Sequence, residues 1–253
     1  MLCLLVVLHA EAVGARDFVV STTNDTADAN LDDGECLDAD LACSLRAAVQ
    51  QSGHSGGSNR VLLDNDVYRV ELRSISLAAD NQTTVVGATR SGSIIDGGLD
   101  TRPFDVVGVS VLTLQTLTLQ NGLSGDDGGV RISNGQVTVT RSTISANTSG
   151  SDGGGIRVSD GTTALENSTI TGNSAGSRGG GLRHSKGTVT IVSSTIARND
   201  ATRGGGISTD SASVTLAGSI VAPNVDDDGV DMDCDTDTGE YLTNGANIDG
   251  DDS

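Results

Sequence analysis

Aromatic side chains are almost absent from this sequence of 253 residues, which has no tryptophan, two tyrosines and two phenylalanines. Proteins that cleave sugars commonly hold them against aromatic rings, whose large flat faces suit such stacking. The shortage therefore argues against a polysaccharide-degrading enzyme, although that class stays open as the alternative considered below.

Lysine is also scarce, because Lys186 is the only one, and the net charge of the chain is −19. A protein this acidic repels the phosphate backbone of DNA and RNA. We therefore predict no nucleic-acid partner. The same charge suits a salty or calcium-containing medium.

Long apolar runs are missing too. The longest, Leu2–Leu8, lies within residues 1–15, which we interpret as a signal peptide cleaved near Val13-Gly14-Ala15, although it lacks a basic start. The run is far too short to cross a membrane. We expect an exported protein, extracellular or at the cell surface, with no membrane span in the mature chain.

The chain has four cysteines. Cys3 would leave with the signal peptide. Cys36 and Cys43 are seven residues apart in a polar segment, and in an oxidising compartment they would form a local disulfide. Zinc fits less well, because the pair lacks zinc-finger spacing and a nearby histidine. Cys234 is left without a predicted partner.

What the chain does have is a repeat. Four glycine stretches end at apolar residues that step by 26, 26 and 25, and other columns keep nearly the same period. The columns are Val130, Ile156, Leu182 and Ile207; Val139, Leu165, Ile191 and Leu216; Ile144, Ile170, Ile196 and Ile220; and Asn147, Asn173 and Asn199. Such a period is typical of a solenoid.

Each repeat contains short runs in which Val, Ile and Thr alternate with polar residues, as in half-buried strands. The fixed leucine pattern of leucine-rich repeats is absent. About 25 residues give room for three short strands and three bends. The predicted fold is all-β: a single-stranded right-handed parallel β-helix of about six or seven rungs, with a short N-terminal helical cap.

Glycine and asparagine have structural explanations in this fold. Glycine suits a tight corner, because it adopts positive φ without steric cost. A buried column of asparagines can hydrogen-bond from rung to rung.

The sequence divides into four segments: the signal peptide, a cap at 16–60, rungs at 61–225, and an acidic tail or incomplete last rung at 226–253. In the cap we expect a strand at Phe18–Ser21. We also expect a helix that Ser44 caps and that runs to about Gln51, covering the open end of the first rung.

The cap carries a family resemblance. "CSLRAAVQ", Cys43 to Gln50, resembles the Cys-Ser-Leu-Arg-Glu-Ala signature of the CSLREA domain, with Ala47 in place of glutamate. The upstream "NDTADANLDDGEC" is similar as well. This domain typically begins exported bacterial proteins with β-helix repeats of the pectate-lyase-like superfold. The resemblance implies export and a β-helix, and it implies no activity.

Two acidic loops are candidate calcium sites, because calcium takes six to eight oxygen ligands from such loops. The alternative is a solvated acidic loop, and no cofactor is required by either interpretation. The candidate ligands are Asp28, Asn30, Asp32 and Asp33 in the cap, and Asp231, Asp233, Asp235 and Asp237 in the tail.

Arg131, Arg157 and Arg183 step by 26 and, by alternation, each points outward. Like charges directly opposite one another are unfavourable, so this column is a candidate binding site for an anionic ligand. In the alternative interpretation the side chains simply spread into water. His184 follows an inward column, and we interpret it as a polar residue at a frayed corner rather than a catalytic histidine.

We assign no catalytic residue. Asp127 and Asp152 could face each other one rung apart, as a glycosidase pair would, but both precede glycines at a corner, where Asp is common. We expect a non-catalytic exported surface or matrix protein that contacts extracellular polysaccharide or another cell-surface component. The alternative is a polysaccharide lyase or glycoside hydrolase.

Overall fold

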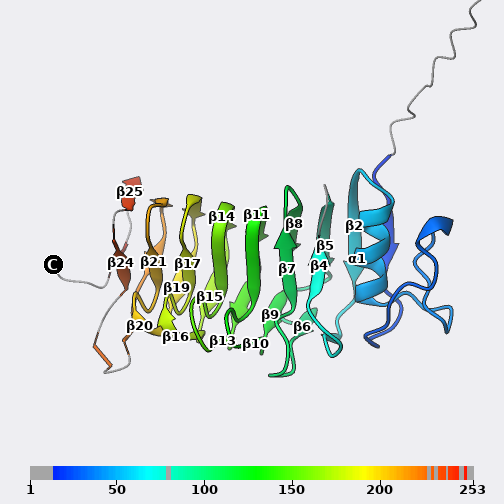
Figure 1. The fold of residues 1–253 in the computed structure, drawn as a ribbon, viewed down its shortest axis with the longest axis horizontal. Coiled ribbons are helices and arrows are strands. Elements are labelled where there is room, and N and C mark those ends of the chain that lie inside the picture. The colour runs from blue at the N-terminus through cyan, green and yellow to red at the C-terminus, as the bar shows by residue number, and fades with distance from the viewer. Residues whose placement is uncertain are drawn as a thin grey trace, which may run out of the picture.

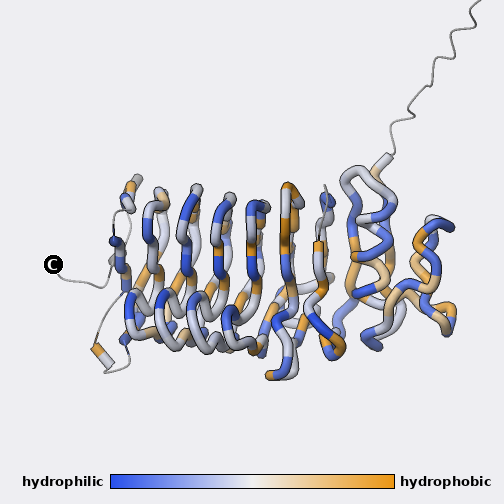
Figure 2. Tube along the Cα trace, in the orientation of Figure 1, coloured by the Kyte–Doolittle hydropathy of each residue, from blue (hydrophilic) through white to orange (hydrophobic). Residues whose placement is uncertain are grey.

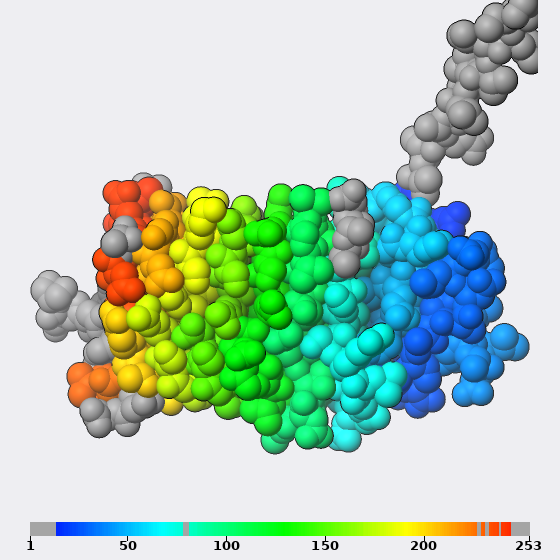
Figure 3. Space-filling view, in the orientation of Figure 1, coloured from blue at the N-terminus to red at the C-terminus, as the bar shows by residue number. Residues whose placement is uncertain are grey.

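The computed structural model of the chain describes residues 14–77, 81–226, 229–230, 233–237, 239–244 and 248–249. In these parts the chain winds into an elongated stack of parallel turns, with a helix at its N-terminal end (Figure 1). The colours of Figure 3 follow the long axis of the stack, because each turn contacts the turn before it and the turn after it.

The largest sheet contains two rows of strands, joined where β11 (Val130–Thr140) and β14 (Ile156–Glu166) run through both rows. One row contains β1 (Asp17–Val19), β2 (Ser58–Leu63), β5 (Gln82–Gly87), β8 (Val111–Gln115), the second halves of β11 and β14, β18 (Gly187–Val192), β22 (Ser213–Ala217) and β25 (Glu240–Asn244). The other row contains β4 (Ile75–Leu77), β7 (Phe104–Val107), the first halves of β11 and β14, β17 (Leu182–His184), β21 (Ile207–Thr209) and β24 (Cys234–Thr236).

Two further parallel sheets complete the turns. One contains β3 (Val67–Arg69), β6 (Ile94–Asp96), β9 (Thr118–Gln120), β12 (Thr143–Ser145), β15 (Thr169–Thr171), β19 (Thr195–Ala197), β23 (Ile220–Val221) and β26 (Ile248–Asp249). The other contains β10 (Leu123–Ser124), β13 (Thr148–Ser149), β16 (Ser174–Arg178) and β20 (Asp200–Arg203). These sheets and the single α-helix of the described residues confirm the predicted all-β parallel β-helix of six or seven rungs with a short helical cap.

The core consists of apolar columns stacked along the axis. Val139, Leu165, Ile191 and Leu216 are register partners in successive strands, and all four are buried. This confirms the predicted register. Hydrophobic and hydrophilic residues alternate along the strands, as expected when one face of each strand lies inside the stack and the other outside (Figure 2).

One predicted column member is wrong. Ile196 pairs with Val221 rather than with Ile220, so Val221 is buried and Ile220 is exposed. Register partners at this turn are 25 residues apart, as in the neighbouring columns, so Ile220, 24 residues after Ile196, lies one position too early. Because side chains alternate between the two faces of a strand, a shift of one residue exchanges the inward position.

The predicted asparagine column forms a hydrogen-bonded ladder. Asn147 Nδ2 donates to Asn173 Oδ1, and Asn173 Nδ2 donates to Asn199 Oδ1, each at 2.9 Å. The ladder continues one turn further than predicted, because Asn199 donates to Asn224, and it ends at the buried Asp233. Each amide also satisfies a backbone N–H of the preceding turn.

The glycine stretches form tight corners. Gly153 has φ +67°, a conformation that residues with a side chain rarely adopt. A Cβ on the next residue, Gly154, would lie 2.5 Å from the carbonyl oxygen of Gly180 in the following turn. Only glycine allows the turns to approach so closely.

The N-terminal end is covered by α1 (Leu45–His54), preceded by a short 3-10 helix, η1 (Leu31–Asp33). The Ser44 hydroxyl accepts from the N–H of Ala47, as predicted for the N-cap, and the helix extends three residues beyond the expected Gln51. Its buried face packs on β2, β4 and β5, so it closes the end of the core. The expected first strand is β1.

Candidate functional site

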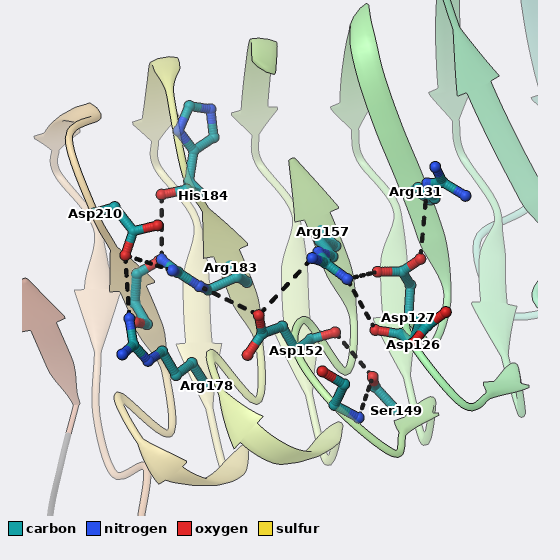
Figure 4. A network of polar contacts seen from close by, with 12 residues as sticks. Asp126, Asp127, Arg131, Ser149, Asp152, Arg157, Arg178, Arg183, His184 and Asp210 are labelled. Carbon is teal, nitrogen blue, oxygen red and sulfur yellow. Dashed lines mark hydrogen bonds and ion pairs between the residues drawn. The ribbon is translucent and has the colours of Figure 1, made fainter. Parts of the chain in front are cut away.

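A row of charged side chains runs along the outside of the stack, where strands follow the glycine corners (Figure 4). Arg131, Arg157 and Arg183 are register partners in β11, β14 and β17. The same register places Asp105 one turn before Arg131 and Asp235 two turns after Arg183. The three arginines thus form a stacked column whose flanks are acidic.

A second charged column lies beside the first, directly before the glycine corners. It changes sign along the axis and contains Asp127, Asp152, Arg178 and Arg203. Carboxylates therefore accompany the arginine column in the earlier turns. In the later turns, where the second column is basic, the negative partners are Asp210, Asp235 and Asp237.

Asp127 lies at the centre of the earlier half, with its side chain only 1% exposed. Its Oδ2 accepts from Arg102 Nη1 at 2.9 Å, and its Oδ1 accepts from Arg157 Nη1 at 2.8 Å. Arg131 Nε lies 3.8 Å from Oδ2. Both oxygens of this buried carboxylate are thus occupied by guanidinium groups.

Asp152 connects the earlier half to the later half. Its Oδ2 lies 3.9 Å from both Arg157 Nη2 and Arg183 Nε. Arg183 Nη2 then donates to Asp210 Oδ1, which also accepts from Arg178 Nη1 at 3.1 Å. Figure 4 shows these contacts following one another along the stack.

The later half ends at the tail of the chain. Arg178 donates to Asp237 at 3.0 Å, and Arg203 donates to Asp235 at 3.0 Å and to Asp237 at 3.1 Å. The hydrogen bond from Arg203 lowers the pKa of the Asp237 carboxyl below its ordinary value.

Together these contacts make one connected ionic network. Its members are Arg102, Arg131, Arg157, Arg178, Arg183 and Arg203 with Asp105, Asp127, Asp152, Asp210, Asp235 and Asp237. Its formal charges balance, although the chain as a whole carries −19. The network is therefore a neutral stripe on an acidic molecule.

The three members of the arginine column all point outward as predicted, but they differ in exposure. The side chains of Arg131 and Arg157 are 40% and 28% exposed, whereas that of Arg183 is 4% exposed. Arg183 is covered because it lies against Asp210 and Asp152 rather than extending into water. Binding of an anionic ligand by this column stays a prediction.

The candidate calcium ligands of the cap accept hydrogen bonds from backbone N–H groups of their own loop. Asp28, Asn30 and Asp33 accept from the backbone N–H groups of Asn30, Asp32 and Glu35, respectively. Burial raises the pKa of Asp28 above its ordinary value. Within residues 14–77, as in the other described parts, no three acidic, histidine or cysteine side chains are placed to hold a metal ion.

The candidate ligands of the tail are dispersed. Asp233 is buried beneath Asn224, and Asp235 and Asp237 pair with arginines of the network. Asp231 lies outside the described residues. Calcium at either loop stays a prediction.

The "CSLRAA" segment has a structural role at every position. Cys43 forms the predicted disulfide with Cys36, and Ser44 caps α1. Leu45 and Ala47 are buried, and Arg46 pairs with Asp25. These contacts join the acidic loop, the helix and the first turn.

His184 is fully buried, so its interpretation as a residue at a frayed corner is wrong. It follows Val158 and precedes Thr209 in an inward column. Neither ring nitrogen has a hydrogen-bond partner. Burial, with a smaller effect of Arg183, lowers its pKa to about 4.

The sequence interpretation named two acidic partners of the arginine column, Asp127 and Asp152, but not the other two, Asp105 and Asp210. The further network members Arg102, Arg178 and Arg203 were not named either. A usable signal exists, because Arg178 and Arg203 precede glycine stretches as Asp127 and Asp152 do. Aligning that position as a column shows charges of both signs beside the arginine column.

No helix in the described parts of the chain is both long and apolar enough to cross a membrane. Residues 106–248 match the family model described as a right handed beta helix region, which is more than half of the chain. No curated protein and no solved structure matches the chain. The matched segment does not include Cys43 to Gln50, so the CSLREA resemblance stays a prediction.

Proposed function

This chain belongs to the right-handed β-helix family, and from that premise we propose that it is an exported, non-catalytic surface or matrix protein that contacts acidic polysaccharide. Family membership supplies the fold, and one fold can host unrelated functions. The function is therefore argued from the charged network and the cap.

The observation that carries the proposal is that the buried acidic groups of the network are already occupied. Glycoside hydrolysis needs two carboxyl groups that face the sugar, one of them able to donate a proton. Both oxygens of Asp127 accept from guanidinium groups, and Arg157 lies between Asp127 and Asp152. This pair has no carboxylate arranged toward a substrate.

A calcium-dependent lyase is also poorly supported. Such an enzyme needs a cluster of carboxylates for the ion and a basic side chain beside it. The described residues form no such carboxylate cluster. Arg183, a basic side chain of the column, is covered by its acidic partners Asp152 and Asp210.

Binding of an anionic glycan is better supported, because the N–H groups of the Arg131 guanidinium are not used in hydrogen bonds within the described chain. Its ion pairs with Asp105 and Asp127 are 3.9 and 3.8 Å long, beyond hydrogen-bond distance. Among the described residues its guanidinium makes no hydrogen bond, and the side chain is 40% exposed. A carboxylate or sulfate group could accept from it without displacing another contact.

Export is supported by the disulfide between Cys36 and Cys43, because disulfides persist mainly in oxidising compartments. The apolar run Leu2–Leu8, which would direct export, lies outside the described residues. Detection of the mature chain in culture medium or on intact cells would test this part of the proposal.

Affinity electrophoresis through gels that contain pectate, alginate or a neutral glucan tests the binding. We expect retardation by an acidic polymer and weaker retardation for Arg131→Gln. Arg69→Gln is the matched control, because Arg69 is an exposed arginine in another sheet, in β3. Equal retardation of both variants would argue against the arginine column.

The enzymatic alternative is tested with the same polymers in solution. We expect no ultraviolet absorbance from unsaturated uronides and no new reducing ends, with or without added calcium. Calcium-dependent formation of either product by the wild-type protein would overturn the non-catalytic assignment.

A further inference from the structure

The first strand of the largest sheet has an edge without a partner strand. Among the described residues β1 pairs only with β2, so it is the end strand of its row. The edge of a sheet presents unpaired N–H and C=O groups, to which a strand of another chain can add. The free edge of β1 is therefore a candidate interaction surface.

The backbone of β1 alternates between its two sides. The carbonyl of Arg16 and the N–H of Val20 form hydrogen bonds with β2. Because alternate residues of a parallel strand bond to the same neighbour, the N–H and C=O groups of Asp17 and Val19 point to the other side. These four groups have no hydrogen-bond partner in the described chain.

A loop of the cap faces this edge across a groove. Ser21, the next residue on the same side, donates its N–H to the carbonyl of Cys43 at 2.8 Å and so ties the loop to the end of β1. Before that point the loop lies further from the strand, and two adjoining hollows of about 440 and 270 Å³ separate them. The groove lies between residues 16–21 on one wall and residues 33–43 on the other.

The two ends of the groove differ in chemistry. Beside the end of β1, Val19 and Leu41 are apolar side chains that are 60% and 77% exposed. Beside its start, Asp33 and Glu35 are exposed, and neither has an ion pair among the described residues. A segment that fits both ends must carry an apolar side chain and a basic one.

The surroundings of the groove also favour a basic partner. The segment from Asp17 to Cys43 is rich in acidic residues and contains no basic one. A guanidinium of the chain itself, that of Arg16, already lies against the loop wall, because its Nη1 donates to the carbonyl of Gly34 at 3.3 Å. Complementary charge attracts a basic segment to this surface and repels an acidic one.

We propose that the groove binds an extended segment of a partner protein, which adds as a strand to the free edge of β1. The segment is basic where it meets Asp33 and Glu35, and apolar where it lies beside Val19 and Leu41. Main-chain hydrogen bonds to Asp17 and Val19 supply affinity, and the side chains supply specificity, as in other cases of strand addition. The groove is separate from the arginine column and does not depend on glycan contact.

Fluorescence polarisation of a labelled, end-blocked heptapeptide, Lys-Thr-Val-Thr-Val-Thr-Lys, tests the proposal on the full chain. The peptide places lysine and valine on the same face of a strand and is symmetric, so it can pair in either direction. We expect saturable binding. Proline in place of the central threonine keeps the charge but removes a main-chain donor, and should weaken binding at least about tenfold. Glutamate in place of both lysines should weaken it by a similar factor.

Two protein variants test the groove itself. Val19→Pro removes the N–H that faces the groove and leaves the bonds to β2 in place, and edge strands tolerate proline. It should weaken binding about tenfold, whereas Val19→Thr keeps the N–H and should bind nearly as the wild type does. Glu35→Lys should also weaken binding about tenfold. Its matched control is Glu166→Lys, the same charge reversal at an exposed position of β14, which should have little effect.

Circular dichroism and retention of the disulfide should show that each variant keeps the fold. Equal binding of the proline peptide would overturn strand addition. Normal binding by folded Val19→Pro and Glu35→Lys would place the peptide elsewhere, and no binding by the wild type would equally overturn the proposal. Self-association of the wild type that Val19→Pro abolishes would assign the groove to a second copy of the chain instead of a partner segment.

Discussion

Arg46 and Asp25 form a buried bidentate ion pair: Nε donates to Oδ1 at 2.6 Å and Nη2 to Oδ2 at 2.9 Å. Asp25 Oδ2 also accepts from the N–H groups of Glu71 and Leu72 in the first turn. Burial alone would raise the pKa of Asp25, but the hydrogen bonds from Arg46 and the backbone outweigh it and lower the pKa. One carboxylate therefore ties the acidic loop, the helix and the β-helix together.

Arg46→Gln should lower the free energy of unfolding by about 3–5 kcal/mol, because it leaves Asp25 buried without its charge partner. Chemical denaturation followed by circular dichroism would measure the loss. Arg60→Gln is the matched control, since its pair with Asp17 is exposed to solvent, and it should leave the stability nearly unchanged. Equal losses in the two variants would contradict a special role for the buried pair.

Asn173→Ala should destabilise the middle of the stack by about 2–4 kcal/mol. The substitution removes the acceptor of Asn147 and the donor to Asn199 and Ile144, and buried groups left unpaired cost about 1–3 kcal/mol each. Denaturant titration would measure the effect. Asn24→Ala changes an exposed asparagine whose side chain makes no hydrogen bond in the described structure, and it should stay within about 0.5 kcal/mol of wild type.

The sequence predicted the features that depend on period and alternation. Val139 and Leu165 are inward and in register, and Asn147 and Asn173 form the ladder, because stacking repeats each environment once per turn. Val221 was missed because an adjacent isoleucine, Ile220, also suits a core position, although the neighbouring columns step by 25 at this turn and place Val221 inward.

The ionic network was only partly predictable. Alternation indicates whether a side chain points inward or outward, but it does not show where a long side chain ends. Arg183 is covered because its guanidinium reaches Asp210, 27 residues further along the chain. The junction between the cap and the first turns depends on how α1 packs against β4, and no repeat in the sequence encodes it.

Replacing Cys36 and Cys43 with serine should lower the free energy of unfolding by about 2–3 kcal/mol, because the disulfide closes a short loop beside the cap helix. Mass spectrometry of alkylated, unreduced secreted protein should find neither cysteine modified. Cys234→Ser keeps this disulfide and controls for the loss of a cysteine elsewhere. Alkylation of Cys36 and Cys43 in freshly secreted protein would contradict both the bond and the argument for export.

His184 gives the core a dependence on pH. The ring lies inside the stack with both nitrogens unpaired, and burial and then the charge of Arg183 lower its pKa, while Asp160 acts in the opposite direction. Lys186 pairs with that carboxylate at the surface. Folding therefore favours the neutral form of the His184 ring over the protonated form.

The pKa of His184 is about 4 in the folded chain and 6.5 in the unfolded chain. As the pH falls, the unfolded chain therefore takes up the proton first. The stability linked to this residue is complete above pH 6.5, declines below it and is lost by about pH 4, a difference of about 3 kcal/mol. Urea titrations at pH 7.5 and pH 4.5 would measure the decline.

His184→Leu should remove most of this pH dependence and also raise the stability at pH 7.5, since it removes two unpaired buried nitrogens. His184→Gln should flatten it without that gain, because the amide cannot titrate but is still polar. If both variants lost as much stability between the two pH values as the wild type, the decline would belong to other groups and not to His184.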